Sequence, residues 1–274
     1  MAAIGQGPPL LRTAHWLSHV EHDARSPVWT HWLDALSRGH TFIRYDQRGC
    51  GLSDWSPPST SFEAWIDDLE AVVEANGLTR FPLFGMSQGG AIAIAYAARH
   101  PEKVSHLVLF GAYARGMLRR EITPPQREEA ETLVKLIRLG WGRDNPAFRQ
   151  VFTSQFIPEG THEQHQWFND LERLSASPEN AATIVETLYG LDVAGEAERI
   201  RVPTLVLLRA MMRASRSKRG GGWPDSFRPP ASSRWKAAIT SSCRRSLPGR
   251  SSSRSFAASL AAAQLQPIPW RRRD

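Results

Sequence analysis

The chain has 274 residues and a formal net charge of +7, from 34 Lys or Arg and 27 Asp or Glu. The basic excess lies near the C-terminus: from Arg209 onward there are 15 basic and 2 acidic side chains, whereas residues 1–208 hold 19 basic and 25 acidic ones. The basic character therefore belongs to the C-terminal segment and says nothing about the partners of the folded body. With only Cys50 and Cys243, no disulfide framework is indicated and a reducing compartment is expected.

The length suits one catalytic-type domain with room for an inserted subdomain. No stretch is long and apolar enough to span a bilayer, and residues 1–7 lack the basic and apolar regions of a secretion signal. We therefore expect no membrane partner and a cytoplasmic location.

The first 112 residues alternate strand and helix patterns. Strands are predicted at residues 9–14, 41–46, 81–84 and 104–110, and helices at 26–39, at 60–77 behind a Thr60/Glu63 capping box, and at 91–98. Such alternation predicts a mostly parallel sheet covered by helices on both faces. Ligands of these sheets bind at the carboxyl ends of the strands.

A Gly-x-Ser-x-Gly turn at residues 85–89 follows an apolar strand and precedes a helix of small residues. This context favours Ser87 as a nucleophile exposed on a sharp strand-to-helix turn. A plain turn with a helix-capping serine is the alternative, and the surrounding strand and helix argue against it.

Two other polar segments invite different interpretations. The glycine-rich loop at residues 48–54 resembles a phosphate cradle, but it lacks the Lys-Ser/Thr ending and no helix starts directly after it, so a structural turn is favoured. His15, His19 and His22 could suggest a metal, but their spacing matches no known zinc set, and we expect none.

Residues 113–195 carry helical apolar stripes and no strand pattern, which predicts a helical cap inserted above the strand ends. A buried strand returns at residues 200–208. The aromatic side chains of the cap are expected mostly to pack, with a minority lining a pocket: Trp141, Phe156, Trp167 and Phe168.

Three segments together resemble the α/β-hydrolase superfamily: residues 45–54, 85–90 and 98–104. Residues 15–23 narrow this to a subgroup similar to small bacterial hydrolase domains found beside, or fused to, helix-turn-helix regulators or nucleotide cyclases. The resemblance implies an α/β-hydrolase fold with its core at residues 1–112 and 196–208 and its cap at 113–195. It also implies hydrolysis of a small carboxylic ester or similar acyl bond, with no metal or organic cofactor.

The resemblance carries roles for individual residues. Ser87 would attack an acyl carbonyl, and the backbone N–H groups of Gln88 and Trp16 would hold the oxyanion. Asp46 and Arg48 are expected to shape their loop. Residues 2–5 would be what remains of an N-terminal β-hairpin.

The acid and the histidine of the expected triad are missing. Arg209 to Met212 occupy the place of the acid, and no histidine follows His165. We therefore expect an impaired enzyme, since His15 or His19 as a substitute base would lie by the oxyanion loop. Residues 209–274 form a basic, low-complexity segment that we expect not to fold natively.

A shifted reading frame near Leu208 would explain this segment. In the shifted frame, each new codon joins the third base of one codon to the first two bases of the next. The new codon that spans Met211 and Met212 encodes an aspartate, and the one that spans Ile239 and Thr240 can encode a histidine. These positions mark where the triad acid and histidine are expected.

Two non-enzymatic alternatives stay open. The same fold could serve as a non-catalytic small-ligand-binding or signalling domain. The Arg-rich segments 213–219 and 271–273 could bind nucleic acid, but a shifted frame yields the same composition, so this alternative ranks last.

Overall fold

The structure, a computed structural model, describes residues 1–209 and 235–240. Their strands form one sheet in the order β1-β3-β2-β4-β5-β6-β7. The strands are β1 (Ala2–Ile4), β2 (Pro9–Arg12), β3 (Thr41–Arg44), β4 (Phe81–Met86), β5 (Val104–Phe110), β6 (Thr204–Arg209) and β7 (Trp235–Thr240). All neighbours pair in parallel except β1, which pairs antiparallel with β3. The predicted mostly parallel sheet is confirmed. Strand β1 lies at residues expected to remain from an N-terminal β-hairpin, and it pairs with β3 at the edge of the sheet.

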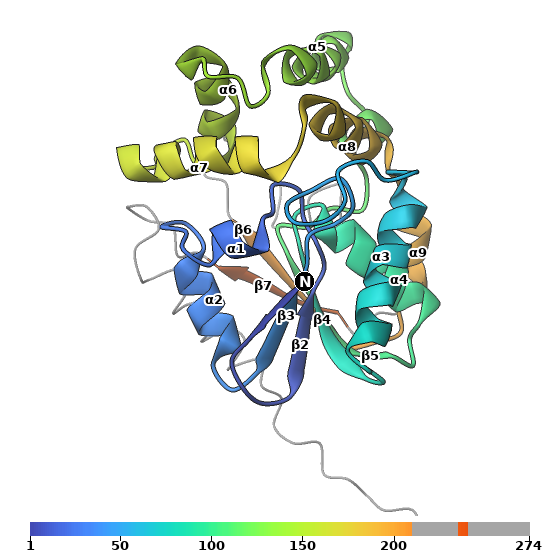
Figure 1. Cartoon of the computed structure of the whole chain (residues 1–274). Helices are drawn as coiled ribbons and strands as arrows, with labels where there is room; N and C mark the ends of the chain where they lie inside the picture. The colour runs from blue at the N-terminus through green and yellow to red at the C-terminus, as the bar shows by residue number, and fades with distance from the viewer. Residues whose placement is uncertain (210–234, 241–274) are drawn as a thin grey trace, which may run out of the picture.

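Helices cover both faces of this sheet (Figure 1). They are α1 (Val20–Asp23), α2 (Thr30–Ser37), α3 (Phe62–Ala75), α4 (Gly89–Arg99), α5 (Pro124–Gly140), α6 (Pro146–Phe156), α7 (His162–Ser175), α8 (Pro178–Gly190) and α9 (Ala194–Arg199), with a 3-10 turn at Met117–Arg119. Helix α2 lies on one face, helices α3, α4 and α9 lie on the other, and α5 to α8 form a cap above the sheet.

The two faces have separate apolar clusters. On the α2 side, Leu33 and Leu36 pack with Phe42, Phe84 and Leu207 of the strands. On the other side, α4 is buried over its whole apolar length because small residues alternate with isoleucines, which lets the helix approach the sheet closely.

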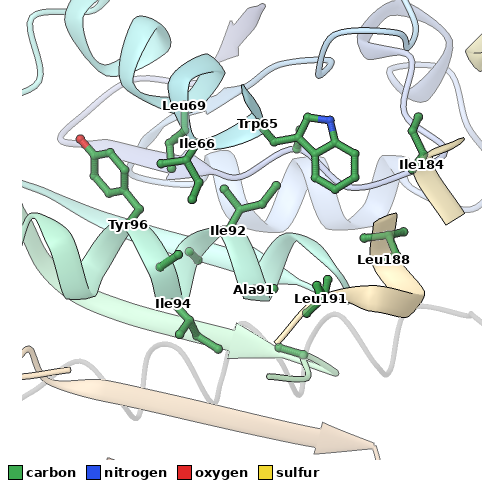
Figure 2. Packing of buried hydrophobic residues seen from close by; sticks show 14 of the residues in the cluster. Trp65, Ile66, Leu69, Ala91, Ile92, Ile94, Tyr96, Ile184, Leu188 and Leu191 are labelled. Carbon is green, nitrogen blue, oxygen red and sulfur yellow. The ribbon is translucent and has the colours of Figure 1, made fainter. Parts of the chain in front are cut away.

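The cap shares the larger cluster. Figure 2 shows Trp65 of α3 and Ile92 of α4 close to Ile184 and Leu188 of α8, and all four belong to one buried cluster. The same cluster extends to Trp141 at the end of α5. The cap is therefore packed onto the core and does not form a core of its own.

Two predicted helix starts are wrong. Helix α3 begins after Ser61, whose side chain accepts a hydrogen bond from the Ala64 N–H, so Ser61 and not Thr60 is the N-cap. Helix α2 begins at Thr30, because Ser26 Oγ instead accepts from the N–H groups of Val28 and Trp29, both at 2.9 Å, and closes a turn.

Strand β7 was not anticipated. It lies within residues 209–274, which we expected not to fold, and it pairs in parallel with β6 from Thr204↔Trp235 to Arg209↔Thr240. The strand forms by backbone pairing with β6, and its own sequence has no apolar pattern that would predict it. The remaining residues of that segment, 210–234 and 241–274, lie outside the described parts of the chain.

Candidate functional site

Ser87 stands at the junction between β4 and α4. Its side chain is exposed and its φ is 51°, in the left-handed region that residues other than glycine rarely adopt. The Ser87 N–H donates to the Phe110 carbonyl at 3.0 Å, which ties the turn to β5. A strained backbone held in place by the sheet is what an exposed nucleophile on a sharp turn requires.

Gly85 explains why this turn can be so tight. A Cβ atom on Gly85 would lie 2.7 Å from the Gly90 Cα and 2.8 Å from the Ala93 Cβ. The last residues of β4 therefore run directly against the first turn of α4, and any side chain there would push them apart.

The loop that follows β2 lies beside this turn, because β2 and β4 are neighbours in the sheet. Within the described chain, the backbone N–H groups of Trp16, in this loop, and of Gln88, next to Ser87, donate to no protein acceptor. Both are thus free to donate to a ligand at the carboxyl edge of the sheet.

Aromatic rings fasten the same loop to the cap. The Trp16 indole stacks on Trp141 with ring centroids 5.1 Å apart, and it lies 6.1 Å from the Phe156 ring. Trp141 and Phe168 are buried packing residues, as expected, whereas Phe156 is 42% exposed. Phe156 is therefore the cap aromatic most open to a ligand beside Trp16.

The three histidines of the loop have structural partners. His15 Nδ1 hydrogen-bonds the Trp16 carbonyl at 3.1 Å, and burial lowers the pKa of His15 to about 3. His19 Nδ1 accepts from the His22 N–H at 3.2 Å and caps α1, while the His22 ring stacks on Trp167 at 4.7 Å. Among the residues described, no His, Cys, Asp and Glu gather into a group that could hold a metal.

A buried ionic cluster lies beneath the loop. Arg12 and Arg44 follow the apolar residues of β2 and β3, and Asp23 ends α1; all three side chains are buried. Arg44 NH1 lies 3.9 Å from Asp23 Oδ2, and neither carboxylate oxygen of Asp23 has a hydrogen-bond partner among the described residues. Burial raises the pKa of Asp23 to about 7 and lowers the pKa of Arg12 to about 10.

The sequence interpretation missed this cluster. An arginine at the carboxyl end of each of two apolar strands, Arg12 and Arg44, was the available signal. Their partner Asp23 could be found only from the path of the loop, which brings α1 back over the strand ends.

The glycine-rich loop after β3 is structural, as expected. Asp46 Oδ2 accepts from the N–H groups of Val20 and Leu52, each at 3.1 Å. Arg48 pairs with Asp68, with its Nε 2.9 Å from Oδ1. The Gly51 N–H donates to the Ser175 carbonyl at 2.7 Å, so the loop amides bind the protein itself rather than a phosphate.

Within the described chain, Ser87 has no base: its hydroxyl makes no hydrogen bond, and the ring nitrogens His15 Nδ1 and His19 Nδ1 bond to Trp16 and His22 instead. Met211 and Met212, where the triad acid is expected, lie outside the described residues. Ile239 and Thr240, where the histidine is expected, end β7 opposite Leu208 and Arg209.

No helix in the part of the chain that is described has the length and apolar character needed to cross a bilayer.

Known proteins are similar to this chain in sequence and in fold. The sequence profile described as alpha/beta hydrolase fold matches residues 23–238, a range that runs past residue 209. The AB hydrolase superfamily protein YisY of Bacillus subtilis is 31% identical over 210 residues, which cover 74% of this chain and 74% of that protein. Pyrrolizixenacetamide deacetylase of Xenorhabdus hominickii is 29% identical over 208 residues, or 74% of this chain and 73% of the relative.

Among solved structures, the esterase EaEST of Exiguobacterium antarcticum superposes with a TM-score of 0.71 at 22% identity, covering 96% of this chain and 93% of the other. The superfamily and the fold predicted from the sequence are thus confirmed. The chain belongs to the alpha/beta hydrolase fold family.

Proposed function

We propose that this protein is a serine hydrolase that cleaves a small carboxylic ester or a similar acyl bond, with Ser87 as its nucleophile. The observation that carries the proposal is the exposed Ser87 side chain on a backbone with a φ of 51°, between β4 and α4. A strained turn persists only where its surroundings hold it, and such turns concentrate at functional sites. The deacetylase and esterase among the similar proteins also act on acyl bonds, as their names state.

The chemistry would run through an acyl-enzyme. The Ser87 Oγ attacks the acyl carbon, its proton leaves to a base, and the carbonyl oxygen gains a negative charge. The free N–H groups of Gln88 and Trp16 are the donors available for that oxyanion. The leaving alcohol takes a proton, and water then releases the acid by the reverse sequence.

Catalysis in the chain as given would be weak, because the base and the acid that orient it are missing. No histidine follows His165, and removing members of such a triad costs about 10⁶-fold in kcat in subtilisin. We further propose that the gene is read in a shifted frame from near Leu208, with the acid restored at Met211 or Met212 and the histidine at Ile239 or Thr240. The low cysteine content supports a cytoplasmic location. The resemblance to small bacterial hydrolase domains implies a bacterial-type enzyme with no metal or organic cofactor.

The test is to resequence the gene between the codons for Val202 and Arg245 and to assay two proteins, the chain as given and the chain translated in the restored frame. With 4-nitrophenyl acetate and butyrate, we expect the chain as given to hydrolyse near the background rate and the restored-frame chain to be at least 10³-fold faster. The Ser87→Ala variant of the restored chain should lose that rate, whereas Ser56→Ala, at an exposed serine outside the site, should keep it. A restored chain that is no faster would refute the proposal.

One observation favours a second candidate, a non-catalytic small-ligand-binding or signalling domain. In the described chain, the Ser87 hydroxyl has no hydrogen-bond partner while the cap still covers the strand ends. Saturable binding of a short-chain ester by the chain as given, with a confirmed reading frame and no turnover, would support this candidate over the hydrolase.

A further inference from the structure

Thr13 joins the loop that carries Trp16 to the turn that carries Ser87. It is fully buried, its N–H donates to the Phe84 carbonyl at 3.0 Å, and its Oγ1 lies 2.8 Å from the Gly89 carbonyl. The Phe84 carbonyl is also 3.4 Å from Oγ1, but the single hydroxyl proton goes to the shorter contact. Thr13 therefore binds both β4, before Ser87, and α4, after it.

The two segments touch at this point. A Cβ atom on Gly89 would lie 2.5 Å from the Ala14 carbonyl oxygen and 2.7 Å from Thr13 Oγ1. The first turn of α4 thus rests against the backbone at residues 13 and 14. In the described parts of the chain, the Thr13 hydroxyl makes the side-chain hydrogen bond that spans this contact.

We propose that Thr13 is a positioning residue that sets the separation between the Trp16 and Gln88 N–H groups. This inference rests on the proposed function, in which both groups hold the oxyanion. Gln88 directly precedes Gly89, and Trp16 follows Thr13 by three residues, so the Thr13–Gly89 hydrogen bond closes a short path between the two donors. Each donor must lie about 2.7–3.1 Å from the oxyanion, so a small shift weakens one of them.

The chemistry of threonine suits this role. Valine has nearly the same shape and is also β-branched, but its methyl group would face the Gly89 carbonyl in place of the hydroxyl. A carbon atom approaches a carbonyl oxygen only to about 3.3–3.6 Å, compared with the 2.8 Å seen for Oγ1. The loop would then move away from α4 by roughly 0.5 Å or more.

The matched control is Thr204, at the start of β6. It is also buried, and its Oγ1 donates to the Val202 carbonyl at 3.0 Å. It lies at the amino end of its strand, whereas Ser87 follows the carboxyl end of β4. Thr204→Val removes the same kind of hydrogen bond without touching either donor.

The experiment measures the second-order rate constant for labelling of Ser87 by an alkyl fluorophosphonate in the full-length restored-frame chain, which carries the proposed base. We expect Thr13→Val to lower it about tenfold or more, since loss of one oxyanion donor costs about 10²–10³, and Thr13→Ser and Thr204→Val to stay within about twofold of wild type. A Thr13→Val rate equal to that of wild type would overturn the inference. Equal losses in Thr13→Val and Thr204→Val would also overturn it, because they would indicate a general loss of stability.

Amide hydrogen exchange separates this inference from the proposed function. In Thr13→Val, exchange at residues 14–17 and 88–90 should rise about tenfold over wild type, and in Thr204→Val it should not. If Ser87 is never labelled in the restored-frame chain, the proposed function fails, while this local increase would still support the spacing role of Thr13. Unchanged exchange in Thr13→Val overturns the inference whatever the labelling shows.

Discussion

The indole rings of Trp16 and Trp141 stack with their centroids 5.1 Å apart and their planes 26° from parallel. Trp16 belongs to the loop beside the turn that carries Ser87, and Trp141 is the C-cap of α5, the first helix of the cap. The loop that carries one proposed oxyanion donor is therefore packed directly against the cap, so cap mutations should reach the site through this contact.

Replacing Trp141 tests how tightly the cap packs at this contact. Trp141 is 2% exposed, and its Nε1 donates to the Ala176 carbonyl at 3.1 Å. Trp141→Ala should lower the free energy of unfolding by roughly 3–5 kcal/mol, from lost burial and the cavity left behind. Trp55→Ala, at a tryptophan that is 39% exposed, should cost roughly 1 kcal/mol or less, as surface changes usually do. Urea denaturation followed by circular dichroism measures both, and similar losses would contradict the packing described.

Asp23 predicts a pH dependence of stability. Its pKa in the folded protein is about 7, above the ordinary value of 3.8, because burial penalises the carboxylate. The folded state thus favours the protonated form, and this contribution to stability is full below about pH 4 and is lost as the pH rises to about 7. The charged groups around Asp23 are Arg12, Arg44 and Asp46.

Asp23→Asn removes this titration. Between pH 5 and pH 8.5, the free energy of unfolding of the variant minus that of wild type should rise by roughly 2–4 kcal/mol. Asp23 is largely protonated below about pH 7, so the substitution removes a counter-charge from the arginines only at higher pH, and the slope rather than the absolute difference is diagnostic. Asp170→Asn, which breaks a surface pair with Arg173, should show no such slope. A flat difference for Asp23→Asn would mean that Asp23 is ionised throughout.

The backbone of Ser87 predicts a conflict between stability and function. A left-handed conformation costs a residue with a Cβ about 1–2 kcal/mol, and glycine avoids this cost at some expense in chain entropy. Ser87→Gly should therefore raise the free energy of unfolding by about 0.5–1 kcal/mol while abolishing labelling. Ser87→Ala should abolish labelling without the gain. Thermal unfolding of the three proteins tests this, and a destabilised Ser87→Gly variant would contradict a φ of 51°.

The start of α3 offers a test between sequence and structure. Ser61 caps the helix in the structure, whereas the sequence pattern favoured Thr60. Ser61→Ala should cost about 1 kcal/mol and Thr60→Ala only a few tenths. Equal losses of stability in chemical denaturation would contradict Ser61 as the N-cap of α3.

Local patterns predicted the elements well where one sequence property dominates. Residues 104–110 form β5 with the bounds expected from their apolar run, and the Gly-x-Ser-x-Gly turn located Ser87 at a strand-to-helix junction. These features depend on short-range chemistry: burial of an apolar strand, and glycines beside a strained serine.

Features that depend on distant residues were missed. The Thr13–Gly89 hydrogen bond spans 76 residues, and the pairing of Arg44 with Asp23 depends on how the loop folds back. Strand β7 forms by pairing with β6 although Trp235–Thr240 has a basic, low-complexity context. Sequence periodicity carries no information about such contacts, because each partner alone resembles an ordinary surface or strand residue.

The most direct test of Ser87 as a hydrolase nucleophile is peptide mapping by mass spectrometry after reaction with a fluorophosphonate. We expect one covalent adduct, on the peptide that contains Ser87, and we expect it to be lost in Ser87→Ala but kept in Ser56→Ala. An adduct at another serine, or none in a folded protein of either reading frame, would contradict this expectation.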